Sequence, residues 1–170
     1  MKLHLFLTGQ KGIGKSTIIK KVTQNLELSI GGFETYKGIG NDQNIYISPW
    51  NKRYYDIEHQ VGIRDGIKAD GKTYTFDNLG VQILETSNKT SQLIIMDELG
   101  FLENKADNFQ THCLKTISND IPVLGVIKEQ KGLWLDKIRN HKNVQVIQVT
   151  IENRNQLVNV ITNHFKNKNG

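Results

Sequence analysis

The 170-residue sequence predicts an α/β fold with a mostly parallel central sheet. Short apolar runs alternate along the chain with stretches whose apolar residues recur every three or four positions. A glycine-rich loop joins the first apolar run to the first of these helix-like stretches. A later run, residues 93–96, is apolar without a break, as is typical of a strand buried on both faces of a parallel sheet. We expect one domain over residues 1–170.

The first half of the chain is predicted to hold one strand, one helix and a region divided by glycines. Lys2–Leu7 is a short apolar run that ends where the glycines begin, so it predicts a strand. An apolar stripe at helical spacing predicts a helix over 16–26. Glycines separate short stretches between 31 and 76, which favours hairpins and loops there. We expect residues 38–76 to form a small β-rich insertion or lid.

The second half is predicted to continue the alternation of strands and helices. Residues 144–149 alternate Val or Ile with Gln, which indicates a strand with one wetter face. The predicted elements are a helix from Asp77 through Leu84, a strand over 93–96, a helix over 109–117, a strand over 121–127, a helix over 133–139, a strand over 144–149 and a closing helix over 155–165.

Composition and charge exclude several classes of protein. Lys and Arg number 22 against 17 Asp and Glu, so the net charge of +5 suits an anionic ligand. These basic residues are scattered, and a nucleic-acid partner is not expected. One cysteine, Cys113, excludes an intrachain disulfide framework and a cysteine-based zinc site. The apolar runs are far shorter than the ~20 residues of a bilayer span, and the first is too short for a signal peptide, so we expect a cytoplasmic protein without membrane contact.

The glycine loop carries a phosphate-binding motif. Gly9–Ser16 fits G-x-x-x-x-G-K-[ST] between a predicted strand and a predicted helix. Its glycines let several backbone N–H groups point at one anion, and the helix dipole favours the same charge. Lys15 would reach the β- and γ-phosphates, Ser16 would bind Mg²⁺ and Thr17 could bond the α-phosphate. The predicted nucleotide-binding residues of the loop are Thr8, Gly9, Gln10, Lys11, Gly12, Ile13, Gly14, Lys15, Ser16 and Thr17.

An accidental match and a dinucleotide fold are the alternatives for this loop. The G-x-G-x-x-G order of dinucleotide folds does not fit, because the glycines here stand at 9, 12 and 14. A chance match would not be expected to fall between a strand and a helix, which the phosphate-binding mechanism requires. The phosphate-binding interpretation is therefore favoured.

Two acidic residues follow the buried run 93–96. Asp97 and Glu98 should lie at the carboxyl edge of the sheet, where the glycine loop also begins. Asp97 is then placed to hold Mg²⁺, directly or through a water. Glu98 is placed to orient or deprotonate the water that attacks the γ-phosphate. The alternative is a pair of solvated loop acids or a helix-capping Asp.

Two further residues are weaker candidates for the same site. Glu103 could contact the base, support another site residue or do neither. Arg154 follows the last predicted strand, so it should lie at the same sheet edge as the phosphate loop. It could stack on a base or reach a phosphate, and its alternative is a plain surface charge.

Taken together, these segments resemble a known family over nearly the whole chain. The matching pieces are Leu7–Thr17, Gly31–Thr35, Ile94–Gly100 with Glu103 and Phe109, Val123–Gly125, Ile138–Asn140, Val149–Thr150 and Glu152–Asn155. The chain resembles the small nucleoside-triphosphatases first described from thermophiles, which include the cancer-related nucleoside triphosphatase of animals. The Gly-Gly-Phe-x-Thr piece and the Thr-x-x-Asn-Arg tail are more specific than the phosphate loop.

The resemblance implies a P-loop fold of the RecA-like kind, a three-layer sandwich. It implies slow Mg²⁺-dependent hydrolysis of ATP, GTP and other nucleoside triphosphates to the diphosphate. Lys15 and Ser16 would then contact phosphate and metal, Asp97 the metal, and Glu98 would activate water. The chain departs from the family pattern at Phe101, where the family usually has Lys, at Val126, where it usually has Thr, and between Lys37 and Lys72.

Two other functions remain as alternatives. A nucleoside or nucleotide kinase would use the same loop to pass the γ-phosphate to an acceptor, but only Arg53 and Arg64 lie in the expected lid. A non-enzymatic nucleotide switch or an RNA-associated module would not need Glu98 beside Asp97. We therefore expect a nucleoside-triphosphatase, with Mg²⁺ as cofactor, in a monomer or weak oligomer.

Overall fold

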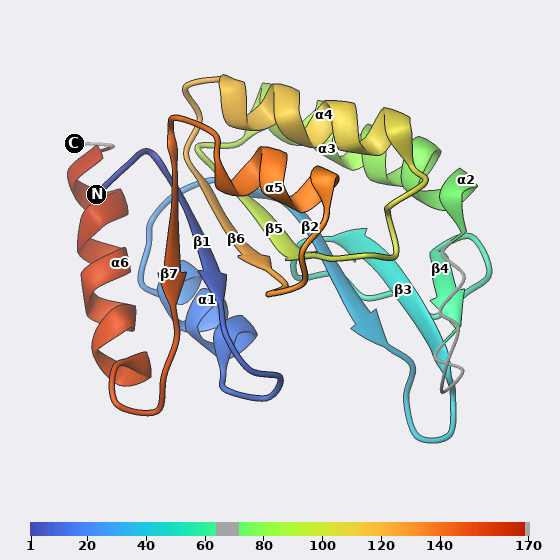
Figure 1. Cartoon of the computed structure of the whole chain (residues 1–170), viewed down its shortest axis with the longest axis horizontal. Coiled ribbons are helices and arrows are strands. Elements are labelled where there is room, and N and C mark those ends of the chain that lie inside the picture. Colours follow the sequence, from blue (N-terminus) through green and yellow to red (C-terminus); the bar gives the residue numbers. More distant parts are fainter. Residues whose placement is uncertain (64–71, 169–170) are drawn as a thin grey trace.

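The computed structural model of the chain describes residues 1–63 and 72–168. Seven strands of these residues form one sheet in the order β4-β3-β2-β5-β6-β1-β7 (Figure 1). The strands are β1 (His4–Thr8), β2 (Ile30–Lys37), β3 (Asn44–Pro49), β4 (Gln60–Ile63), β5 (Leu93–Leu99), β6 (Val123–Ile127) and β7 (Val144–Gln148). The helices are α1 (Lys15–Gln24), α2 (Thr73–Thr75), the π-helical turn η1 (Phe76–Gly80), α3 (Val81–Thr90), α4 (Asp107–Ser118), α5 (Leu133–Arg139) and α6 (Arg154–Lys168).

Five neighbouring strands of the sheet run parallel. They are β2, β5, β6, β1 and β7, while β3 and β4 pair antiparallel at the β2 side. The predicted α/β fold with a mostly parallel sheet is therefore confirmed. Within the described part of the segment 38–76, β3 and β4 extend the central sheet rather than forming a separate one. Part of that segment, residues 64–71 with Arg64, lies outside the described residues, and its role as a lid stays a prediction.

Helices cover both faces of the sheet and make three layers (Figure 1). Because side chains alternate along a strand, Leu5 and Leu7 of β1 pack with α1 and α6, whereas Phe6 packs with α3, α4 and α5. The parallel strands are apolar on both faces for this reason. Among the described residues, none of the helices is both long and apolar enough to cross a membrane.

Strand β5 is longer than the sequence predicts. It continues through Asp97 and Glu98 to Leu99, so the two acids lie within the strand and not in a loop after it. Pairing partners on both sides explain the extension, since Asp97 stands opposite Glu34 of β2 and Val126 of β6. The peptide bond between Asp97 and Glu98 is cis.

Gly32 lets β2 lie closely against β5. Its φ is +99°, and a Cβ atom there would stand 1.9 Å from the carbonyl oxygen of Ile95. Any larger residue would push the two strands apart. Close pairing at this point brings Glu34, two residues further along β2, beside Asp97.

The helix expected from Asp77 begins earlier, at Thr73, and includes the π-helical turn η1. Gly80 ends this turn, and a Cβ atom there would lie 2.7 Å from a ring carbon of Phe109 in α4. The glycine thus allows α4 to pack against this helix, while the sequence pattern only marked the apolar positions that follow it.

His4 gives the fold a dependence on pH that can be measured. The ring is fully buried in β1, and its Nδ1 accepts a hydrogen bond of 3.2 Å from the backbone N–H of Val123. Burial lowers the pKa of His4 from 6.5 to about 4. In the window between these values the unfolded chain binds more protons than the folded chain, so stability falls as the pH falls.

We expect this group to lower the free energy of unfolding by about 2 kcal/mol between pH 7 and pH 5. His4→Asn should remove that part of the pH dependence, because Asn offers an acceptor but does not titrate in this range. Urea titrations of both proteins at the two pH values measure the difference. An identical loss of stability in both proteins would contradict the prediction.

Candidate functional site

The phosphate loop, residues 9–14, connects β1 to α1. Gly9, Gly12 and Gly14 have φ of 137°, 79° and 108°, values that side chains with a Cβ atom rarely adopt. A Cβ atom at Gly9 would also lie 2.8 Å from the carbonyl oxygen of Val149. Helix α1 begins directly after Gly14, so its first N–H groups face the loop. The backbone therefore has the form of an anion-binding turn at a helix N-terminus, as predicted.

Lys15 reaches back across this loop. Its Nζ donates to the carbonyl oxygens of Gly9, at 2.6 Å, and Gln10, at 2.8 Å. Partial burial lowers the pKa of Lys15, while nearby carboxylates that include Glu98 and Asp97 raise it. The ammonium group thus lies among the acids that the sequence also assigned to the site.

Ser16 and Asp97 join the loop to β5. The Ser16 hydroxyl donates to Oδ1 of Asp97 at 3.2 Å, although the two residues are 81 positions apart. Asp97 is only 5% exposed. Its pKa is raised to about 7, chiefly by burial; the Ser16 hydrogen bond opposes this rise, and the charges of Glu98 and Glu34 add to it. The structure brings together the hydroxyl and the carboxylate that were predicted to share a metal.

Glu34 adds a second buried carboxylate that the sequence analysis did not assign. It stands opposite Asp97 in the β2–β5 register, and its side chain is 4% exposed. Arg53 binds it through Nε at 3.2 Å and Nη2 at 2.9 Å, and stacks over the Tyr36 ring at 4.7 Å. A charged residue inside the Gly-Gly-Phe-x-Thr piece was a signal, but nothing in the sequence links it to Arg53.

Glu98 is the more open of the two predicted acids. Its side chain is 34% exposed, and its backbone N–H donates to Oγ1 of Thr35 at 3.3 Å. The Lys128 ammonium lies 3.3 Å from Oε1 of Glu98. Lys128 directly follows β6, which lies between β1 and β5. The sequence analysis did not assign Lys128, since a lone lysine after a strand has no distinguishing pattern.

Glu103 is used within the turn that follows β5. It is 2% exposed, and it accepts a hydrogen bond of 2.5 Å from the backbone N–H of Gly100. Burial raises its pKa to about 7. The structure therefore shows Glu103 as a buried support for the turn after β5, and the roles considered for it at the site stay predictions.

Arg154 lies at the start of α6, in an exposed position. The loop before it is fixed by reciprocal hydrogen bonds between Thr150 and Asn153, at 2.9 Å and 3.3 Å. The backbone N–H of Val149 donates to the Thr8 carbonyl oxygen at 2.9 Å, so this loop adjoins the phosphate loop. A contact of Arg154 with base or phosphate stays a prediction.

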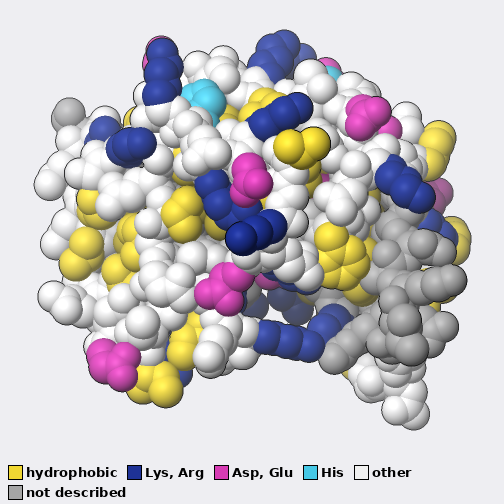
Figure 2. Space-filling model, viewed as in Figure 1, with side chains coloured by type: hydrophobic (Ala, Val, Ile, Leu, Met, Phe, Trp, Pro, Cys, Tyr) yellow, Lys and Arg dark blue, Asp and Glu magenta, His cyan; other side chains and the backbone are white. Residues whose placement is uncertain are grey.

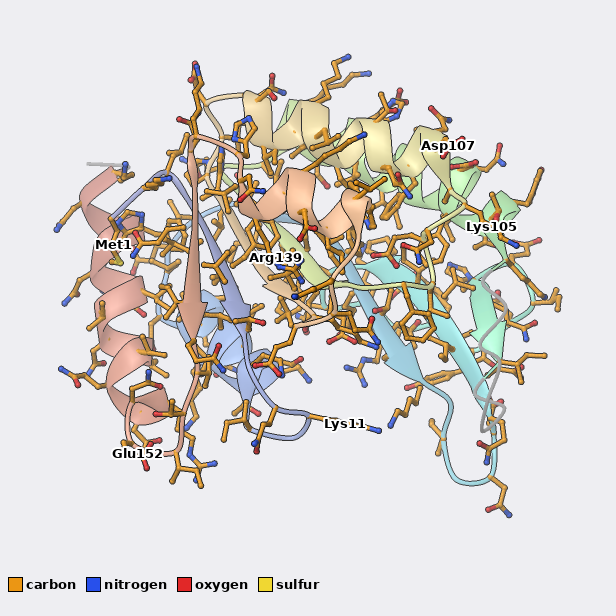
Figure 3. All side chains as sticks on the ribbon, in the orientation of Figure 1. Met1, Lys11, Lys105, Asp107, Arg139 and Glu152 are labelled. Atoms are coloured by element: carbon orange, nitrogen blue, oxygen red, sulfur yellow. The ribbon has the colours of Figure 1, made fainter. Side chains whose placement is uncertain are left out.

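The surface near the phosphate loop is hollowed. Figure 2 shows a hollow on this face with Lys and Arg side chains, and also Asp and Glu side chains, at its edge. Figure 3 shows Lys11 extending from the phosphate loop toward the side of β2 and β3. Positive side chains that could attract an anionic ligand thus lie at the hollow together with acidic ones.

Comparisons with known proteins agree with the arrangement. A family model described as NTPase matches residues 4–162. Nucleoside-triphosphatase THEP1 of Methanocaldococcus jannaschii is 30% identical over 170 residues, covering 95% of this chain and 96% of the relative. The THEP1 protein of Thermotoga maritima is 28% identical over 177 residues, covering 99% and 98%. The solution structure of a human cancer-related nucleoside triphosphatase matches with a TM-score of 0.72 at 26% identity, covering 95% of this chain and 96% of that one.

Proposed function

We propose that this chain, which belongs to the NTPase family and is therefore a hydrolase of nucleoside triphosphates, acts on ATP, GTP and other nucleoside triphosphates with Mg²⁺. The products are the nucleoside diphosphate and inorganic phosphate. Glu98 activates the water in this proposal. The observation that supports it most directly is the hydrogen bond of 3.2 Å between the Ser16 hydroxyl and Asp97. This bond links the residue two positions after the phosphate loop to the strand that carries Asp97 and Glu98. The names of relatives that span nearly the whole chain support the same substrate class.

The phosphate loop binds the triphosphate in this proposal. Backbone N–H groups of the loop and the N-terminus of α1 face the β-phosphate, as in other loops of this form. Lys15 exchanges the carbonyl oxygens of Gly9 and Gln10 for phosphate oxygens. The exchange is favourable because the phosphate oxygens carry negative charge, whereas the carbonyl oxygens are neutral. Thr17 and Arg154 are proposed as further contacts at the same edge.

The donor set fits Mg²⁺. The Ser16 hydroxyl and the Asp97 carboxylate offer hard oxygen ligands at one point. Within the part of the chain that the structure describes, no group of three or more His, Cys, Asp or Glu residues could hold a metal. That is expected of an ion bound by one carboxylate together with substrate phosphates and water. When bound, Mg²⁺ neutralises charge on the phosphate oxygens.

Exposure favours Glu98 as the water-activating group. Asp97, Glu34 and Glu103 are each 5% exposed or less, whereas the side chain of Glu98 is 34% exposed. Glu98 accepts a proton from the attacking water as the oxygen bonds to the γ-phosphorus. The bond between the γ-phosphorus and the bridging oxygen breaks, and the electron pair leaves with the diphosphate. Hydrolysis then yields one nucleoside diphosphate and one inorganic phosphate.

Phosphate release from ATP, GTP, CTP and UTP tests the proposal. We expect steady release with Mg²⁺, and a fall to the no-enzyme rate when EDTA removes the metal, because the phosphate charges are then no longer neutralised. Adding Mg²⁺ in excess of the chelator should restore the rate. Undiminished release in EDTA would exclude the metal, and phosphate transfer to an added nucleoside in place of release to water would indicate a kinase.

A further inference from the structure

Lys128 holds a second positive charge at the site, and its backbone is fixed from two sides. Its N–H donates to the carbonyl oxygen of Leu99 at 2.9 Å, which ties the end of β6 to the end of β5. Its carbonyl oxygen accepts from the guanidinium of Arg139, which also donates to the carbonyl oxygen of Gln130 at 2.6 Å. Figure 3 shows Arg139 near the middle of the molecule, above the carboxyl end of β6.

The side chain of Lys128 is directed by its neighbours toward Glu98. Its aliphatic stem lies over Gly100, where an added Cβ atom would stand 3.0 Å from the lysine Cδ. The ammonium group lies 4.9 Å from the centre of the Phe101 ring and 3.3 Å from Oε1 of Glu98. Glycine thus gives the stem room, and the aromatic ring supports the charge from one side.

Lys128 also shares the site with Lys15. The charge of Lys128 contributes to lowering the pKa of Lys15, while Glu98 acts in the opposite direction. The two ammonium groups therefore lie close enough to repel each other, with Glu98 near both. A terminal phosphate group beside the two ammonium groups would carry more negative charge than the Glu98 carboxylate, so it would attract them more strongly.

The order of the strands places Lys128 between the phosphate loop and the two acids. Strand β6 lies between β1, which leads into the phosphate loop, and β5, which carries Asp97 and Glu98. Its carboxyl end therefore opens between the two halves of the site, where the terminal phosphate of a nucleotide on the loop would lie. At 35% exposure the Lys128 side chain keeps the freedom to change partner.

We propose that Lys128 is a second cation for the terminal phosphate, and that it makes the site prefer triphosphates to diphosphates. In the free protein it pairs with Glu98. With a triphosphate bound it pairs with the γ-phosphate and leaves the Glu98 carboxylate available to water. This inference rests on the proposed function, because it requires the nucleotide to occupy the phosphate loop.

Binding and turnover of Lys128→Met test the proposal, with Lys128→Arg as the conservative variant. Met keeps the apolar stem without the charge. We expect the affinity for a non-hydrolysable ATP analogue with Mg²⁺ to fall by about 10- to 100-fold, and that for ADP to change by less than about 2-fold. The value of kcat should fall as well, and Lys128→Arg should regain most of the preference for the analogue. Calorimetry and initial rates give these quantities.

Lys105→Met is the matched control, because Lys105 is an exposed lysine far from the phosphate loop (Figure 3). It should bind both nucleotides as the unchanged protein does. An unaltered ratio of analogue to ADP affinity in Lys128→Met would overturn the inference. An equal loss for both nucleotides, which a purely structural role predicts, is one form of that unaltered ratio. Failure of the proposed function would look different, since the unchanged protein would then lack phosphate release altogether.

Discussion

Lys15→Ala is expected to lower the affinity for Mg²⁺-ATP by at least about 100-fold, because it removes the charge that the loop presents to the β- and γ-phosphates. In the structure the Lys15 ammonium donates to two loop carbonyl oxygens, at 2.6 Å and 2.8 Å. These bonds hold the group at the mouth of the loop. Alanine leaves the backbone N–H groups in place, so any remaining affinity reports what they contribute without the lysine.

Calorimetry with Mg²⁺ and a non-hydrolysable ATP analogue measures this effect. Lys21→Ala is the matched control, since Lys21 is an exposed lysine in the last turn of the same helix. Its affinity should equal that of the unchanged protein. A urea midpoint for Lys15→Ala close to that of the unchanged protein would show that the fold persists. Undiminished affinity in the folded variant would contradict the proposal that the phosphate loop binds the nucleotide through Lys15.

The local parts of the site could be predicted from the sequence. The phosphate loop is one uninterrupted segment whose glycine spacing sets its conformation, and the structure gives Gly9, Gly12 and Gly14 the positive φ that such a loop needs. Outside residues 31–76, most strands and helices followed from apolar runs and apolar periodicity, because each element buries a face that its own residues define. Asp97 could be placed beside the loop because parallel strands share a carboxyl edge.

The contacts between distant segments could not be predicted in this way. The partners Glu34 and Arg53 lie on β2 and in the loop after β3, and their pairing depends on how β3 extends the sheet. Strand order decided the position of Lys128, since β6 is inserted between β1 and β5. The sequence also ended the buried run at Met96 and did not predict that Asp97 would be buried, because charged residues favour exposure unless partners compensate for burial. The bond from Ser16 supplies one such partner.

Glu98→Gln is expected to keep Mg²⁺-ATP binding and to lower turnover by about 100-fold or more, the scale of a lost general base. Glutamine has the size of glutamate and retains an oxygen that can face Lys128, so the contact of 3.3 Å can persist without an ion pair. What it lacks is a carboxylate that can accept the proton of water. Binding can even tighten, because one negative charge beside the phosphates is removed.

A comparison of kcat with the affinity for the ATP analogue separates these effects, and Glu27→Gln, at an exposed acid after α1, is the control that should change neither. Turnover equal to that of the unchanged protein would require another base. Glu34 would be the next carboxylate to consider, but it is 4% exposed and bound by two nitrogens of Arg53. It could meet water only after losing that partner, which would leave a buried charge unpaired at a cost of about 3–5 kcal/mol. Glu98 has no such barrier, because Lys128, with which it forms an ion pair, is itself a group that a bound phosphate would attract.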